Sequence, residues 1–393
     1  MRLVPVLAAC LSLAPCGAAR AEVPCGGDFR GFVAGLKAEA VALGHDRVMA
    51  DRFLAGVRQD PAVLRADRAQ GFFQRDFIDF SRRLISQSRL DNGRRNATRY
   101  DSVFTVIEGR FGVSRGVLLA FWALETDYGA VQGEFNTLNA LVTLAHDCRR
   151  PALFRPQVFA ALTLFERGDF DPATTTGAWA GEIGQVQMLP ADILKNGVDG
   201  DGDGHVRLKT SAVDALMSGA NMLRDLGWRA NEPWLQEIVI PDNLPWAETG
   251  LGHAKSVSDW AGMGVRARTG SLGPGSLAAS VLLPMGRGGP AFLAYPNFRV
   301  FFEWNRSLVY VTTAAYLATR LEGAPVFDAR NPEPGLSGEQ MKVLQGKLTE
   351  RGHDVGGIDG ILGEKTRAAV QKEQERLGMP ADSWPTAALL NRL

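Results

Sequence analysis

Glu125 is the strongest candidate in this chain for a residue that carries out chemistry, because it follows a strongly apolar run over residues 117–124. A helix would place Phe121, Glu125 and Tyr128 on one face, since they recur at i, i+4 and i+7. A carboxylate at the edge of an apolar surface is desolvated, which raises its pKa and suits a general acid at neutral pH. Such an acid can protonate a glycosidic oxygen. The alternative is a glutamate that only caps the helix or makes an ion pair, and this pattern alone weighs the two equally.

Residues 199–210 form a second candidate site, an acidic loop spaced like that of an EF-hand. Its aspartates lie at positions 1, 3 and 5, and hard carboxylate oxygens at this spacing suit calcium. Position 12 is Thr210 rather than the bidentate glutamate of an EF-hand. We expect a structural calcium ion here, and the alternative is an Asp-Gly turn solvated by water. The candidate ligands are Asp199, Asp201, Asp203, His205 through its carbonyl, and Asp214.

The elements around Glu125 are predicted to be helical from about residue 32 to residue 164. Ser114 is a reasonable N-cap for the helix that ends in Glu125, and residues 103–110 predict the helix before it. Asn and Gly at 92, 93 and 96 are expected to interrupt the helical pattern. An earlier helix is predicted from the spacing of Phe72, Phe73, Phe77, Phe80, Leu84 and Ile85.

The pattern changes after residue 168. Residues 168–210 are rich in Gly, Asp and Thr and predict an irregular loop with one short helix, followed by a helix over 211–226. Short strand-like runs at 235–240, 279–283 and 299–302 predict a small β subdomain inserted in the helical body. A last helix is expected at 307–321, before a polar, Pro-containing linker.

The N-terminus has the features of a signal peptide. Arg2 precedes an apolar run over 3–15, and small residues lead to an A-x-A site, so we expect cleavage after Ala21 and export to the periplasm. A lipoprotein anchor at Cys16 is disfavoured by Pro15. The chain has 393 residues, a length that predicts two or three domains.

The cysteine content bears on the redox state of the compartment, and the net charge bears on the kind of partner. Cys25 and Cys148 remain after cleavage, and in an oxidising compartment they form either a disulfide or two buried thiols. Lys+Arg and Asp+Glu are both 43, so no net charge steers the protein toward nucleic acid or an anionic membrane. We expect no nucleic-acid partner and a monomer.

Five segments in order resemble one family, the membrane-bound lytic transglycosylase B family (glycoside hydrolase family 103). ETDYG at 125–129 is similar to its E-T-x-Y-G motif. The other segments lie at 177–190 (GAWAGEIGQVQMLP), 198–204, 214–228 and 290–307, and the resemblance covers roughly residues 30–325. It implies a mostly α, lysozyme-like catalytic domain that contains the small β subdomain.

The resemblance also implies a reaction and a site. Glu125 would protonate the oxygen between N-acetylmuramic acid and N-acetylglucosamine and then act as base, while the muramic C6 hydroxyl attacks C1. One carboxylate suffices for this lytic transglycosylase reaction, which yields 1,6-anhydromuramic ends without a cofactor. The implied substrate-binding residues are Gln187, Asn305, Tyr128, Trp179 and Trp304, with core packing as the alternative for the two tryptophans.

Two departures from the family pattern keep alternatives open. Ala178 replaces a serine that could support the glutamate, which leaves room for a non-catalytic wall-binding protein. Glu182 adds a second carboxylate, and a hydrolytic glycosidase uses two, so a water-using muramidase is the other alternative.

Residues 336–393 resemble the peptidoglycan-binding domain type 1, through GIDGILGEKTRAAV at 357–370. The expected organisation is a signal peptide (1–21), a catalytic domain (22–325), a linker (326–335) and this separate three-helix domain (336–393). Peptidoglycan strands are the expected partner, and tethering to this polymer would raise the local substrate concentration. The alternative is a protein-docking domain of the same shape.

Overall fold

The computed structural model describes residues 23–69 and 75–393. The predicted signal peptide, Cys16, Phe72 and Phe73 lie outside these residues. Within them, no helix combines the length and the apolar character needed to cross a membrane.

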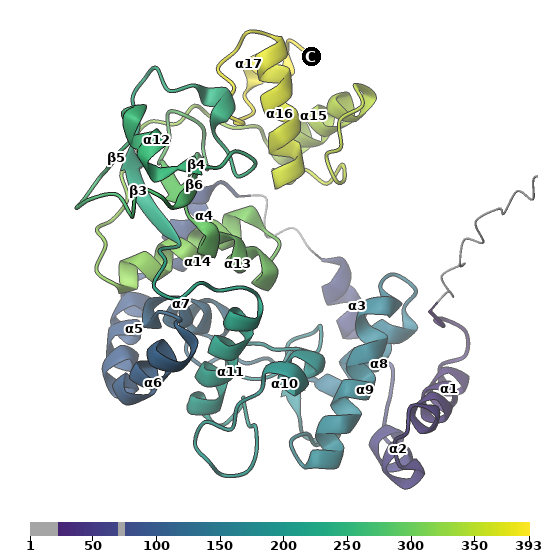
Figure 1. The fold of residues 1–393 in the computed structure, drawn as a ribbon. Helices are drawn as coiled ribbons and strands as arrows, with labels where there is room; N and C mark the ends of the chain where they lie inside the picture. Colours follow the sequence, from purple (N-terminus) through teal and green to yellow (C-terminus); the bar gives the residue numbers. More distant parts are fainter. Residues whose placement is uncertain (1–22, 70–74) are drawn as a thin grey trace, which may run out of the picture.

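The body of the protein is helical, which confirms the predicted fold class (Figure 1). Its helices are α1 (Phe29–Ala42), α2 (Arg47–Leu54), α3 (Pro61–Arg68), α4 (Phe77–Leu84), α5 (Gln87–Arg99), α6 (Asp101–Phe111), α7 (Arg115–Thr126), α8 (Thr137–His146), α9 (Pro151–Arg167), α10 (Pro190–Asn196), α11 (Ala212–Asp225), α13 (Pro296–Trp304) and α14 (Leu308–Leu321). A two-stranded pair, β1 (Phe135–Asn136) with β2 (Thr176–Gly177), lies beside them.

A small β subdomain is inserted between α11 and α13, as the sequence predicted. Its strands are β3 (Leu235–Val239), β4 (Lys255–Ser256), β5 (Arg266–Ala267), β6 (Ala278–Leu282) and β7 (Phe292–Ala294), with the helix α12 (Val257–Gly262) beside them. These strands are antiparallel and follow the order β4-β6-β7-β3-β5. Trp260 of α12 is fully buried and donates its indole N–H to the Ala279 carbonyl at 2.8 Å, which joins helix and sheet.

Two local predictions are wrong. Residues 299–302 are helical, not extended, because Pro296 occupies the first turn of α13, where its fixed φ favours a helix, and Phe298 and Phe301 point into the core. Helix α5, which Ser86 caps at its start, continues through Gly93 without a break. A Cβ at Gly93 would lie 2.6 Å from the Tyr128 hydroxyl, so this glycine permits close packing rather than a break.

The C-terminal residues form three helices, α15 (Gly338–Glu350), α16 (Glu364–Arg376) and α17 (Ala387–Leu390), around a small core of their own. We call these helices and their loops the C-terminal module. The module is docked on the β subdomain (Figure 1). Arg367 donates to the Pro284 carbonyl at 2.5 Å, and Gln371 donates to the Thr249 carbonyl at 2.9 Å. The module therefore has a fixed position on the body in this structure.

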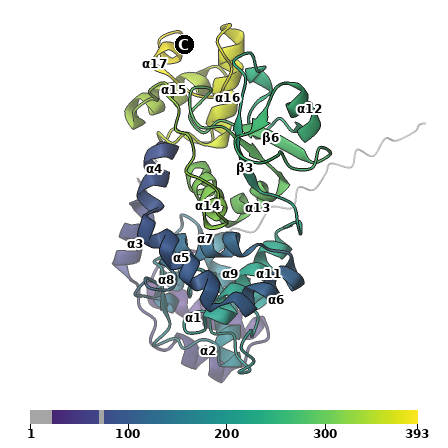
Figure 2. The ribbon, with the colours of Figure 1, turned by 90° about the vertical axis from the view of Figure 1, so that its left-hand side faces the viewer.

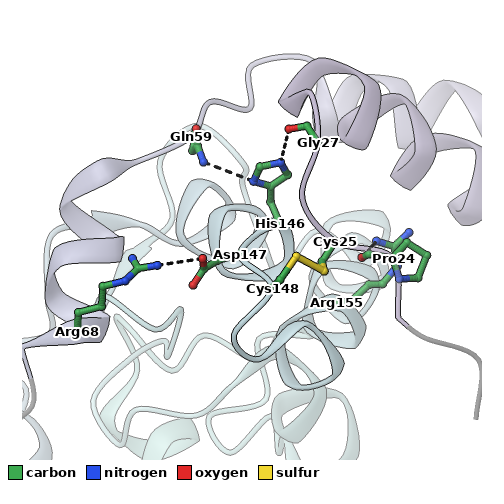
Figure 3. The surroundings of a disulfide bond; sticks show 9 residues. All are labelled: Pro24, Cys25, Gly27, Gln59, Arg68, His146, Asp147, Cys148 and Arg155. Carbon is green, nitrogen blue, oxygen red and sulfur yellow. Dashed lines mark hydrogen bonds and ion pairs between the residues drawn. A yellow bond between two sulfur atoms is a disulfide. The ribbon is translucent and has the colours of Figure 1, made fainter.

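Cys25 and Cys148 form a disulfide, which decides between the two alternatives left open by the sequence (Figure 3). It ties the segment before α1 to the turn between α8 and α9. Neighbouring contacts hold the same turn: His146 lies 3.1 Å from the Gly27 carbonyl, and Arg68 pairs with Asp147 at 3.0 Å.

Candidate active site

Glu125 lies in the last turn of α7, at the end of a nearly continuous buried surface. The helix begins because Ser114 accepts a hydrogen bond from the Gly116 N–H. It ends because Asp127 adopts a left-handed conformation (φ 50°) and its N–H bonds back to the Ala123 carbonyl. The start and the end of α7 thus place Glu125 at the edge of the core.

Two hydrogen-bond donors, from α13 and α14, contact the carboxylate of Glu125. Its Oε1 accepts hydrogen bonds from the Tyr310 hydroxyl at 2.5 Å and from the Trp304 indole N–H at 3.1 Å. Trp304 also stacks on Phe121, with the ring centroids 4.3 Å apart. Trp304 and Tyr310 come from α13 and α14, and Figure 2 shows these helices between the lower helical part and the upper part of the molecule.

Burial raises the pKa of Glu125 to about 7, against the opposing effect of the hydrogen bonds from Tyr310 and Trp304. The negative charge of Glu182 raises it further. Burial also raises the pKa of Tyr310 well above its ordinary value, so this hydroxyl stays protonated and acts as a hydrogen-bond donor to Glu125. A carboxyl group with these neighbours can donate a proton at neutral pH and receive it back.

The segment 177–188 is fastened to the end of α7. Thr126 donates its hydroxyl to the Gln185 carbonyl at 2.6 Å and accepts the Gly129 N–H at 2.9 Å. The side chain of Gln185 accepts the Trp122 indole N–H at 3.1 Å. These bonds join the ETDYG motif at 125–129 to the segment 177–190, so the two motifs form one structural unit.

The other residues predicted to bind substrate are held by local bonds. Gln187 has φ 53° and donates to the Gly184 carbonyl at 2.7 Å. Asn305 accepts the Ser307 N–H at 2.9 Å, and Trp179 is half-buried against the hydrophobic core. Tyr128 donates to the Arg89 carbonyl at 2.8 Å, which places its hydroxyl against α5. Of this predicted set, Trp304 is the one shown in contact with Glu125 within the described residues.

Tyr310 was missed by the sequence reasoning, although it makes the shortest bond to Glu125. The available signal was its position: Ser307 caps α14, and Tyr310 is a polar-tipped side chain three residues later in an otherwise apolar run. An aromatic residue in that place looks like core, and only the packing of α14 on α7 aims its hydroxyl at the carboxylate.

The acidic loop brings three of its predicted ligands together. Oxygens of Asp199, Asp201 and Asp203 lie within 4.8 Å of one another, and all three residues are exposed. Asp214 is instead fully buried, and its carboxylate bonds to the loop backbone, where Oδ1 accepts the Gly200 N–H and Oδ2 accepts the Arg207 N–H. The three carboxylates fit a divalent cation, while Asp214 braces the loop instead of joining them.

His205 is held by its ring. Its Nδ1 lies 2.8 Å from the Asp169 carboxylate, and its backbone N–H donates to the Asp203 carboxylate at 2.9 Å. These contacts fix the loop position at which its carbonyl was predicted to bind the ion.

A mostly helical body with a glutamate at a helix end, whose desolvated carboxyl has a raised pKa, defines a general-acid enzyme of the lysozyme-like class. Residues 28–319 match the family model described as "Transglycosylase SLT domain", and residues 337–393 match "Putative peptidoglycan binding domain". The first match spans more than half of the chain, so the chain belongs to the transglycosylase SLT family.

Solved structures agree with this assignment. SltB3 from Pseudomonas aeruginosa, in complex with NAG-anhNAM-pentapeptide, is 36% identical with a TM-score of 0.86. The match covers 93% of this chain and 99% of that chain. Escherichia coli Slt35 in complex with calcium is 26% identical with a TM-score of 0.65, over 76% of this chain and 96% of that chain.

A curated relative, the membrane-bound lytic murein transglycosylase B of Escherichia coli (strain K12), is 26% identical over 235 residues. The match covers 60% of this chain and 64% of the relative, so the chain spans less than two thirds of that protein's length.

Proposed function

We propose that this protein is a peptidoglycan lytic transglycosylase in which Glu125 is the only acid/base. The observation that carries the proposal is the carboxyl of Glu125, buried with a pKa near 7 and held by Tyr310 and Trp304. The similarity to SltB3, whose complex contains an anhydromuramoyl fragment, supports this reaction over others. The bond cut is the β-1,4 bond between N-acetylmuramic acid and N-acetylglucosamine.

The reaction balances without water. The Glu125 carboxyl gives its proton to the glycosidic oxygen as the bond from that oxygen to the muramic C1 breaks. The muramic C6 hydroxyl oxygen then bonds to C1 and loses its proton to the Glu125 carboxylate, which restores the acid. The product is a 1,6-anhydromuramic end.

The nearest other carboxylate in sequence does not serve as a second catalytic group. Asp127 pairs with Arg89 at 3.1 Å and belongs to the turn that ends α7. Gln187, Asn305 and Trp179 remain proposed substrate contacts, since their amides and ring lie on the segments that are fastened around Glu125. We assign Tyr128 and Trp304 a structural role in the site, because the one polar group of each side chain is engaged within the protein.

The test is mass spectrometry of the products from purified peptidoglycan, with the full mature chain and with Glu125→Gln. Anhydromuramoyl products are expected from the wild type, and the variant should be at least about 10³-fold slower, since general acid–base catalysis contributes 10²–10⁴-fold and here serves both steps. Unchanged thermal unfolding of the variant serves as the control.

The same experiment decides between the alternatives. Ordinary reducing muramic ends from the wild type would indicate a water-using muramidase, with Glu182 as its second carboxylate. No product from either protein, with binding to wall material retained, would indicate a non-catalytic wall-binding protein.

We further propose that calcium binds Asp199, Asp201 and Asp203 and has a structural role, as the calcium complex of Slt35 supports. When bound, the ion would neutralise three neighbouring carboxylates in the loop that follows the Gln187 segment. The C-terminal module would bind the wall polymer, in line with its family match. Export to the periplasm is supported by the Cys25–Cys148 disulfide, because disulfides persist in oxidising compartments.

A further inference from the structure

The turn that follows Glu125 has a strained backbone. Asp127, Tyr128 and Gly129 have φ values of 50°, 61° and 86°, so three successive residues adopt the left-handed conformation. Glycine adopts it freely and aspartate tolerates it, whereas a bulky residue such as Tyr128 adopts it only when its surroundings impose it. Among the described residues, no other two adjacent non-glycine residues both have a positive φ. The end of α7 therefore needs contacts that hold it.

Both strained side chains bond to one residue of α5, Arg89. Its Nε donates to the Asp127 carboxylate at 3.1 Å, and its backbone carbonyl accepts the Tyr128 hydroxyl at 2.8 Å. The guanidinium also donates to the Leu84 carbonyl at the end of α4. The Arg89 side chain is only 20% exposed, so water and salt screen its charge less than that of a surface arginine. One arginine thus links the end of α4 to the end of α7.

Helix α5 also leaves space for Tyr128. Gly93 lies in the middle of α5, where glycine weakens a helix relative to alanine. A Cβ there would lie 2.6 Å from the Tyr128 hydroxyl and would also meet the Leu321 side chain. A larger residue at this position would therefore push Tyr128 away from the Arg89 carbonyl. Arg89 and Gly93, one helical turn apart, together hold the turn after Glu125.

The turn is coupled to Glu125 through the backbone of α7. The Asp127 N–H donates to the Ala123 carbonyl at 3.1 Å, and the N–H of the next residue donates to the Trp122 carbonyl at 3.0 Å. Glu125 lies between the donor and the acceptor of both bonds. A shift of the turn would therefore move the backbone that carries the Glu125 carboxyl.

We propose that Arg89 is a positioning residue for the reaction: through Asp127 and Tyr128 it holds the turn that fixes the Glu125 carboxyl in its reactive place. The proposal rests on the proposed function, because this carboxyl is the one that gives its proton to the glycosidic oxygen. Arg89 has its contacts within the protein and not with the substrate, so its loss should lower kcat and leave KM nearly unchanged.

The experiment is the steady-state kinetics of anhydromuropeptide release from solubilised glycan strands, with the wild type and Arg89→Ala. The variant should have a kcat about 10- to 100-fold lower, since a misplacement of about 1 Å can cost about 10²-fold in rate. The loss is partial because the bond from Thr126 to the Gln185 carbonyl still holds α7. Guanidinium ion at millimolar concentration, far below what unfolds proteins, should recover part of kcat by occupying the vacated site, and sodium ion should not.

Two further variants separate positioning from a general loss of stability. Arg115→Ala removes an arginine from the other end of α7, where it pairs with Glu108 at 2.9 Å and with Asp101 at 2.7 Å. It should lower the melting temperature and, below that temperature, keep kcat within about twofold of the wild type, because the turn after Glu125 is untouched.

Arg89→Lys keeps the charge but cannot donate to Asp127 and to the Leu84 carbonyl from one rigid fork. Its kcat should lie between those of the wild type and Arg89→Ala. Arg89→Lys also keeps the proposal testable if Arg89→Ala does not fold.

The outcomes are distinct. A raised KM with unchanged kcat in Arg89→Ala would overturn the proposal, because Arg89 would then contact the substrate itself. Equal losses of kcat in Arg89→Ala and Arg115→Ala, without recovery by guanidinium ion, would overturn it as well and leave Arg89 a purely structural role. Absence of anhydromuramoyl product from the wild type would instead overturn the proposed function.

Discussion

At the scale of single residues, the proposed chemistry depends on the carboxyl group of Glu125 and on the groups that act on its pKa. Tyr310 and Trp304 donate to Glu125 and favour its ionised form, whereas burial and Glu182 favour the protonated form. These opposing effects leave the pKa near 7, so both forms exist at neutral pH. An acid that must become a base in the next step needs this balance.

Tyr310→Phe tests that balance. It removes a hydrogen bond that lowers the pKa of Glu125, so the pKa rises and the alkaline limb of the kcat/KM profile should move to higher pH. The rate at the optimum should fall about tenfold or more, because the carboxyl loses the donor that orients it.

Tyr316→Phe is the matched control, since Tyr316 lies in the same helix but bonds to the Phe327 N–H instead. It should cost about 1 kcal/mol of stability and leave the pH profile in place. An alkaline limb that moves to lower pH in Tyr310→Phe would contradict the assignment of Tyr310.

At the scale of elements, the site is made by loops and helix ends fastened to α7. The acidic loop follows α10 and precedes α11, and Asp214 of α11 accepts N–H groups at both ends of the loop. This brace orients the backbone, while the three exposed carboxylates repel one another unless a cation binds. Loop order and ion binding should therefore be coupled.

Calcium should raise the melting temperature of the protein, and chelation should lower it, because an ion that binds only the folded state stabilises it. At calcium 100-fold above Kd the gain is about 2.7 kcal/mol. The measurement is thermal unfolding with calcium and with a chelator, followed by circular dichroism.

Asp201→Asn should abolish most of this calcium effect, and Asp242→Asn, which changes an exposed aspartate in another loop, should retain it. Equal calcium effects in both variants would show that the ion binds elsewhere or not at all.

At the scale of the whole molecule, the C-terminal module is part of the folded body and not only a tether. Arg367 contacts the carbonyls of Leu283 and Pro284 and lies over the Trp384 ring, and burial lowers its pKa to about 10. Arg299 of α13 pairs with Glu364 at 3.0 Å, which adds a link between the module and the helix that carries Trp304. A wall-binding module held in this way would have a constant orientation relative to Glu125.

Arg367→Met should loosen the module, because two carbonyls lose a charged donor, at a cost of about 2 kcal/mol or more. Limited proteolysis should then cut between residues 324 and 337 faster than in the wild type. Lys365→Met is the control, since Lys365 makes only an exposed pair with Asp354 and should cost less than about 0.5 kcal/mol. Equal cleavage rates in the wild type and Arg367→Met would mean that the module is held by other contacts.

Local sequence signals were sufficient for the fold class and for the helix that carries Glu125. The apolar run before Glu125, the Ser114 cap and the strand-like runs at 235–240 and 279–283 are short-range patterns, and the structure confirms each of them. The aspartate spacing of the acidic loop is also local, which is why three carboxylates meet as expected. The prediction failed at Gly93, whose close neighbours Tyr128 and Leu321 are distant in sequence, and at 299–302, where Pro296 starts a helix whose phenylalanines pack into the core.

By itself, the sequence determined which residue could act as the acid, which family the chain resembles and where the helix that carries Glu125 begins. Only the tertiary structure decided what surrounds the carboxyl: Tyr310 lies 185 positions away from Glu125 and Trp304 lies 179 away. The same holds for the disulfide, for the bracing role of Asp214 and for the docking of the module. The physical reason is that a pKa, a hydrogen bond and a buried charge depend on distance in space, and distances between remote segments exist only after the chain has packed.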